Sequence, residues 1–200
     1  MPGKFVSERN LKFLLYEVFD TESLTRASYF QDHNADTFDL VLDTAIKISR
    51  SLLLPYLQEM DKNPPAFVDG KVKVHSMVKE FMRQCGDGGW ISAGAPYDFG
   101  GQQLPVTVTA ACHFVMAAAN YSASVYPMLN TGAAHLIESF GSQDLVRTYV
   151  PKLYLGEWQG TMALTEPQAG SSLSDITTQA EPTDGGYYLM RGQKIFISAG

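Results

Sequence analysis

The stretch Gly160-Thr-Met-Ala-Leu-Thr-Glu-Pro-Gln-Ala-Gly-Ser-Ser172 decides the fold of this 200-residue chain. It joins an apolar run that ends in a threonine to a turn of small residues, where backbone can approach a ligand closely. A second stretch, Gln193-Lys-Ile-Phe-Ile-Ser-Ala-Gly200, begins 21 residues after Ser172 and carries a hydroxyl behind its own apolar run. Strands that pass into loops offer backbone N–H groups and short hydroxyls to a bound molecule, so both stretches are candidate binding segments.

The hydrophobic pattern changes just before the first stretch. Up to residue 157 the apolar residues recur at helical spacing, and after it they alternate as in strands. We expect helices at 36–60 (kinked at Pro55), 75–85, 106–128, 131–140 and 143–154. Strands are expected at 161–165, 176–181, 187–191 and 194–198, with a hairpin turn at 183–186. A helical block followed by strands predicts an α+β fold.

Composition and charge argue against several classes of protein. The net charge of −6 does not suit a general nucleic-acid binder, which needs a basic face. The most apolar run, 106–125, is interrupted by Thr, His, Asn and Ser, so it predicts a buried helix and no membrane span. Cys85, Cys112 and the four dispersed histidines lack the spacing of a disulfide framework or a metal site. Because the N-terminus has no apolar core of signal-peptide length, we expect a cytoplasmic protein with reduced thiols.

A series of landmarks occurs in an order that resembles the acyl-CoA dehydrogenase family. Between residues 85 and 200 they are Gly89-Trp90, Pro96, Gly100-Gly101, Asn130-Thr131-Gly132, Phe140-Gly141, Tyr149-Val150-Pro151-Lys152-Leu153, Gly156-Glu157, Met162 to Pro167 and Gly192 to Ser198. Residues 1–84 resemble only a subgroup with an extra N-terminal segment, which includes 3-methylmercaptopropionyl-CoA dehydrogenase-like members. The pattern that carries this second resemblance runs from Lys4 to Phe19.

The resemblance implies a particular order of segments. Residues 1–36 would form the N-terminal extension, and residues 37–157 a helical bundle that is the N-terminal domain of the family. Residues 158–200 would be the first strands of a β-barrel-like middle domain, which the chain enters without completing. The catalytic Glu of the family lies further along than residue 200, so we expect no catalytic residue within this sequence.

The resemblance also implies an FAD site. The family's flavin contacts fall on Met162, Ala163, Leu164, Thr165, Phe196, Ile197 and Ser198. Ser171, beside Gly170, matches a serine that contacts the cofactor or the CoA part of the substrate. Structural roles stay open for these residues: Leu164 and Phe196 can be ordinary strand core, and the hydroxyls of Thr165 and Ser171 can satisfy their own turns. Glu166 is expected to shape its turn with Pro167 and not to act as the base.

Three departures from the family pattern fall inside these segments. Met162 stands where an aromatic residue is common, Ser172 where Asp is usual, and Phe196 where Trp is commoner. Asp175 and Ser174 follow closely and are candidates to replace the missing Asp. These differences bear on stacking and on the hydrogen bonds of the loop, and they leave the assignment unchanged.

An FAD-dependent oxidation of an acyl-CoA to the 2,3-enoyl-CoA is therefore the expected reaction of the complete enzyme. The resemblance implies an electron-transfer flavoprotein as the electron acceptor and a homo-oligomer. Two alternatives remain: an acyl-CoA oxidase, which shares the motif, and a non-catalytic binding or assembly module with the same fold. The 200-residue chain alone is expected to be inactive.

Overall fold

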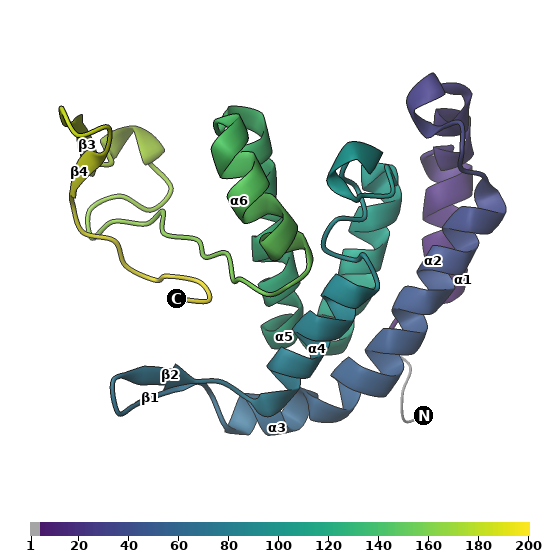
Figure 1. Ribbon diagram of the computed structural model, residues 1–200. Coiled ribbons are helices and arrows are strands. Elements are labelled where there is room, and N and C mark those ends of the chain that lie inside the picture. The colour runs from purple at the N-terminus through teal and green to yellow at the C-terminus, as the bar shows by residue number, and fades with distance from the viewer. Residues whose placement is uncertain (1–4) are drawn as a thin grey trace. The chain divides into compact units, whose positions relative to one another are not determined.

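Helices form the first of two units into which the chain folds. The computed structural model describes residues 5–200, with a helical unit that ends at Gly160 and a smaller unit comprising Thr161–Gly200 (Figure 1). The smaller unit consists of loops and one hairpin. The predicted α+β fold, a multihelical bundle followed by the start of a β domain, is therefore confirmed.

The helical unit opens with a short, irregular helical segment. α1 (Glu8–Lys12) starts at Ser7, whose hydroxyl accepts a hydrogen bond from the Asn10 amide, and it passes into a π-helical turn, Phe13–Val18. Two 3₁₀ turns follow, Thr21–Arg26 and Ser28–Phe30. Most of the Lys4–Phe19 pattern thus lies in this segment, while Lys4 itself is outside the described residues.

The predicted helix 36–60 is present as a run of four helical pieces. α2 (Ala35–Ile48) is capped by Asn34, which accepts a hydrogen bond from the Thr37 amide at 2.9 Å. The run continues as a π-helical turn, Ser49–Leu53, a 3₁₀ turn, Leu54–Tyr56, and α3 (Leu57–Lys62). Pro55 lies at the predicted irregularity, because its ring cannot donate a helical hydrogen bond.

An exposed hairpin separates α3 from α4 (Ser76–Asp87). Its strands β1 (Ala66–Val68) and β2 (Lys71–Lys73) pair antiparallel, with Phe67 opposite Val72. The turn places Asp69 and Gly70 in the left-handed region, at φ 53° and 76°. All six strand residues are exposed, and the hairpin projects from the helices in Figure 1.

α5 (Val106–Phe140) is the central element, and it consists of two helical parts that meet at a kink. The two helices predicted at 106–128 and 131–140 are therefore present, but the break between them lies earlier in the chain. The only backbone in it with non-helical angles is at Asn120, with φ −164° and ψ 92°. The Asn120 side chain explains this position, because its Oδ1 accepts from the Ala123 amide at 3.2 Å and its Nδ2 donates to the Leu53 carbonyl at 3.3 Å. Asn120 therefore caps the second half of the helix. α6 (Gln143–Tyr154) starts at its cap Ser142.

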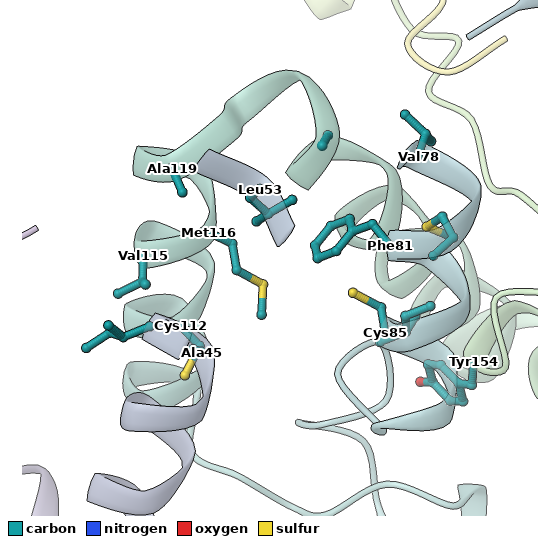
Figure 2. Packing of buried hydrophobic residues seen from close by; sticks show 14 of the residues in the cluster. Ala45, Leu53, Val78, Phe81, Cys85, Cys112, Val115, Met116, Ala119 and Tyr154 are labelled. Carbon is teal, nitrogen blue, oxygen red and sulfur yellow. The ribbon is translucent and has the colours of Figure 1, made fainter. Parts of the chain in front are cut away.

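The core of the helical unit lies where α2, α4 and α6 pack on α5. Figure 2 shows Leu53, Phe81 and Met116 directed toward one another across this space. Cys85 and Cys112 are buried in the same cluster as free thiols, and burial raises the pKa of each to about 12. Such thiols stay protonated and unreactive in the folded protein.

The second unit contains one hairpin, β3 (Gln179–Pro182) with β4 (Tyr188–Arg191). Its turn lies at the predicted position, since the Thr183 amide donates to the Tyr187 carbonyl at 3.0 Å. The expected strands 161–165 and 194–198 are not regular strands: they are joined by a single antiparallel bridge between Met162 and Ser198. The reason in the second segment is Phe196, whose φ of 54° lies in the left-handed region and interrupts an extended chain.

Within residues 5–200, no helix has both the length and the apolar character needed to cross a bilayer. The same residues contain no group of three or more His, Cys, Asp or Glu side chains suited to hold a metal ion.

Candidate functional site

The two candidate binding segments lie side by side within the second unit. The Met162 amide donates to the Ser198 carbonyl at 3.2 Å, and the Ser198 amide donates to the Met162 carbonyl at 3.1 Å. Further along, the Ile195 amide donates to the Thr165 carbonyl at 2.9 Å. Residues 162–165 and 195–198 are thus aligned antiparallel although they are about thirty positions apart in the chain.

Apolar side chains on the paired segments are exposed to solvent. Phe196 is 84% exposed, and Met162, Leu164 and Ile197 are each between 39% and 49% exposed. A large exposed aromatic ring flanked by aliphatic side chains is an apolar surface that another molecule can cover. Phe196 reaches this exposure from a left-handed backbone, which is costly for a non-glycine residue and is a frequent sign of a functional position.

The backbone around Thr165 has two carbonyl groups that accept hydrogen bonds and an amide that donates none within residues 5–200. Its own carbonyl accepts from Ile195, and the carbonyl of Leu164 accepts from the Lys194 ammonium at 3.0 Å. Among the described residues, neither the Thr165 N–H nor its hydroxyl has a hydrogen-bond partner. Thr165 therefore keeps two unused hydrogen-bond donors in the paired segments.

Glu166 is the buried centre of the second unit, with only 2% of its surface exposed. Its Oε2 accepts from the Thr177 amide at 2.7 Å, the Thr177 hydroxyl at 2.8 Å and Gln168 Nε2 at 2.7 Å. Its Oε1 accepts from the Thr178 amide at 3.0 Å and from the Lys194 ammonium at 2.8 Å. The Glu166 carboxylate therefore links its own turn to Gln168, to the segment 177–178 and to Lys194. Such a set of contacts indicates a structural role.

The hydrogen bonds to Glu166 keep it ionised. The bond from Lys194 is the largest cause, followed by those from Thr178 and Thr177, and together they hold the pKa of Glu166 far below its ordinary value of 4.5. A general base needs a pKa near the working pH and access to the proton that it removes. Glu166 has neither, which agrees with its expected role in shaping the turn.

Gly170 and Ser171 lie in an exposed loop that leads from Ala169 to a 3₁₀ turn, Leu173–Asp175. The loop is anchored at its start by reciprocal hydrogen bonds between the backbones of Glu166 and Ala169, at 2.9 and 3.1 Å. The Ser171 hydroxyl has no partner among the described residues, and no hydrogen bond links it to the paired segments. The candidate cofactor residues are thus brought together, whereas the candidate substrate residues stand apart on their loop.

Three residues that hold the Glu166 carboxylate were not predicted from the sequence: Lys194, Thr177 and Thr178. The threonines carry no local signal, because their role depends on a carboxylate that lies eleven and twelve positions away. Lys194 could have been predicted as the partner of Glu166, since it is the one lysine of residues 161–200 and Glu166 is the one buried carboxylate there. Burial of an acid normally requires a cation or several hydrogen-bond donors beside it.

Comparison with known proteins identifies similar sequences over almost all of the chain. Residues 36–157 match the family model described as acyl-CoA dehydrogenase, N-terminal domain. The chain is 31% identical over 192 residues to 3-methylmercaptopropionyl-CoA dehydrogenase of Ruegeria pomeroyi. This match covers 96% of the chain and 33% of the relative, so the chain spans about a third of the length of that protein.

Solved structures share the fold of this chain. The glutaryl-coenzyme A dehydrogenase glutaryl-CoA complex matches with a TM-score of 0.70 and 22% identity, over 82% of this chain and 40% of that one. PigA with FAD and proline matches with a TM-score of 0.67 and 21% identity, over 82% of this chain and 41% of that one.

Proposed function

Because this chain belongs to the acyl-CoA dehydrogenase family, we propose that it is the N-terminal part of an FAD-dependent acyl-CoA dehydrogenase. The reaction is the oxidation of an acyl-CoA thioester to the 2,3-enoyl-CoA. The α carbon loses a proton to a base and the β carbon loses a hydride. Bound FAD would supply the acceptor for that hydride. The base lies outside residues 1–200, so this chain contributes binding and positioning and no proton transfer.

The pairing of residues 162–165 with 195–198 is the observation that carries this proposal. An isoalloxazine ring has flat apolar faces and a polar edge, and it needs a surface with both characters. The exposed side chains of Met162, Leu164, Phe196 and Ile197 fit the faces. The free N–H and hydroxyl of Thr165 fit the edge, and the residues present therefore suit the cofactor.

Each predicted residue then has a separate task. Thr165 donates hydrogen bonds to the polar edge of the ring, and Ser198 places a second hydroxyl near the cofactor. Ala163 has only a methyl side chain, so backbone can approach the ring there. Gly170 and Ser171 present an exposed, unpartnered loop to the CoA part of the substrate. Holding the ring and thioester in fixed relative positions is the protein's contribution to rate at this site.

FAD titration of the purified chain tests the cofactor assignment. We expect saturable quenching of flavin fluorescence and a shifted flavin absorption band, because the ring enters an apolar surface. Riboflavin, which lacks the adenylate, serves as the control for the ring alone. Addition of butyryl-CoA under anaerobic conditions should leave the flavin oxidised, since no base is present. Absence of FAD binding both here and in the complete natural protein would contradict the proposal.

The complete natural protein decides between dehydrogenase, oxidase and non-catalytic module. An antibody to this sequence should detect a band about three times the 22.0 kDa of the chain, in proportion to the length of its relative. We propose that this protein is a cytoplasmic homo-oligomer that passes electrons to an electron-transfer flavoprotein. Reduction of that acceptor by acyl-CoA without oxygen consumption supports a dehydrogenase, and rapid oxygen consumption supports an oxidase. A native band at 22.0 kDa would instead favour the non-catalytic module.

A further inference from the structure

We propose that Lys194 is a positioning residue for the cofactor: by holding the Leu164 carbonyl, it directs the Thr165 N–H away from the protein interior and toward bound flavin. This inference rests on the proposed function, because it assigns a partner to that N–H. Its geometric part concerns only residues of this chain. It can therefore be tested with and without the cofactor.

The argument begins with the peptide group between Leu164 and Thr165. Like every described peptide bond in the chain it is trans, so its C=O and N–H point in opposite directions. The Lys194 ammonium donates to the C=O at 3.0 Å and also contacts the buried Glu166 carboxylate at 2.8 Å. The C=O therefore points toward the Lys194–Glu166 pair, and the N–H points away from it.

The neighbouring peptide group is fixed as well. The Thr165 carbonyl accepts from the Ile195 amide at 2.9 Å, and the Glu166 amide donates to the Ala169 carbonyl at 2.9 Å. The carbonyl and the amide of this neighbouring peptide group are both engaged, so the Thr165 N–H is, among the residues that the structure describes, an unpaired donor next to a peptide group that is held in place. A donor that is held in place before binding loses less freedom when it meets its acceptor.

Lys194 is itself held in place by Glu166. The lysine side chain is 22% exposed and the glutamate side chain 1% exposed, so the pair is largely shielded from solvent. Four further hydrogen bonds fix the carboxylate, from Thr177, Thr178 and Gln168. The ammonium therefore has a fixed anchor, and its second hydrogen bond, to Leu164, transmits that rigidity to Thr165.

A simpler role for Lys194 would be to attract the phosphates of FAD by its positive charge. Its charge is already paired with Glu166 at 2.8 Å, which leaves little net field for a ligand. Arg191 is the other cation of residues 161–200, and it is exposed on β4. Replacing either residue by Met removes one positive charge, but only Lys194 contacts Leu164. Arg191→Met is therefore the matched control.

Residual dipolar couplings of the ligand-free, ¹⁵N-labelled chain test the geometric part. In Lys194→Met we expect the coupling of the Thr165 N–H to change beyond the spread of the other amides of residues 161–200, and in Arg191→Met we expect it to stay. An unchanged Thr165 coupling in a folded Lys194→Met overturns the inference. If residues 161–200 unfold in that variant, Lys194→Arg takes its place, because it keeps a positive charge beside Glu166 but replaces the ammonium by a planar guanidinium, which changes the geometry of the hydrogen bond to Leu164.

FAD titration tests the functional part. We expect the dissociation constant to rise about tenfold in Lys194→Met and to stay within about twofold in Arg191→Met, since one oriented hydrogen bond is lost only in the first. A reoriented Thr165 N–H with unchanged affinity for FAD overturns the inference and leaves the proposed function intact. Failure of the wild-type chain and of the complete protein to bind FAD overturns the proposed function, and the dipolar couplings then still decide the geometry.

Discussion

Asn130 and Gly160 join the central helix to the end of the helical unit. The Oδ1 of Asn130, a fully buried side chain on α5, accepts from the Gly160 N–H at 2.7 Å. The same side chain donates to the Leu153 carbonyl at 2.9 Å and to the Trp158 carbonyl at 2.8 Å. One amide group thus satisfies one backbone group in the last turn of α6 and two that follow α6, and it fixes where the chain leaves the helices.

Asn130→Ala should lower the free energy of unfolding by about 3 kcal/mol, because it leaves a buried N–H and two carbonyls without their partner. Urea unfolding followed by circular dichroism measures this change. Ser139→Ala, at an exposed position of the same helix, is the control and should change stability by less than about 0.5 kcal/mol. Equal stability of the two variants would show that water replaces the Asn130 side chain.

Phe81→Ala should destabilise the helical unit by about 3–5 kcal/mol, since it opens a cavity in the core between α4 and α5. Phe140→Ala makes the same chemical change at a ring that is 83% exposed, and it should be nearly neutral. Thermal unfolding midpoints of the two variants give the comparison. Similar midpoints would contradict the packing described for Figure 2.

The stability of the folded unit 161–200 should depend on pH, because the ionised form of Glu166 holds it together. Folding lowers the pKa of this carboxyl below 4.5, so its ionised form stabilises the folded state above pH 4.5. That contribution is lost progressively as the pH falls below this value, because the unfolded chain then takes up a proton more readily. Amide hydrogen exchange at Thr177 and Thr178, measured downward from pH 6, should show progressively weaker protection.

Glu166→Gln removes the titrating group and should abolish this acid dependence, at the cost of weaker protection at neutral pH. Glu181→Gln, an exposed carboxylate on β3, should keep the wild-type dependence. If wild type and Glu166→Gln lost protection in parallel as the pH fell, another acid would have to be responsible.

Ser198→Ala should weaken FAD binding about fivefold, the effect of losing one hydrogen bond of about 1 kcal/mol. Ser171→Ala should weaken binding of an acyl-CoA to the complete protein by a similar factor and leave FAD affinity unchanged. Ser139→Ala, at the exposed position of α5 used above, is the control for both variants. Isothermal titration calorimetry measures all three, and wild-type affinities in both site variants would refute the assigned contacts.

The spacing of apolar residues predicted much of the helical unit, because helices form through interactions between residues that are close together in the sequence. The helices expected at 75–85 and 143–154 and the irregularity at Pro55 all arise from contacts within a few residues. The break at Asn120 could not be placed, because it depends on the Leu53 carbonyl 67 positions earlier in the chain. A polar residue inside an apolar run can face many partners, and only the packed structure selects one.

In the second unit the apolar pattern located the two segments that pair with each other, but it did not predict their backbone conformation. Apolar alternation predicted strands at 161–165 and 194–198, yet one bridge and the left-handed Phe196 keep them irregular. Backbone angles of this kind are imposed by surrounding contacts and have no sequence signature in a non-glycine residue. The same holds for the network around Glu166, whose donors come from three separate parts of the chain.

The two buried thiols give the protein an internal stability reporter. Cys85 and Cys112 both lie in the helical core, and residues 161–200 contain no cysteine. A thiol-specific reagent can modify them only when the helices open, so the labelling rate measures the opening of the helical unit alone. The helical unit and the proposed cofactor segments can therefore be followed separately in one sample, without any engineered probe: the first by thiol labelling, and the second by flavin fluorescence if FAD binds there as proposed.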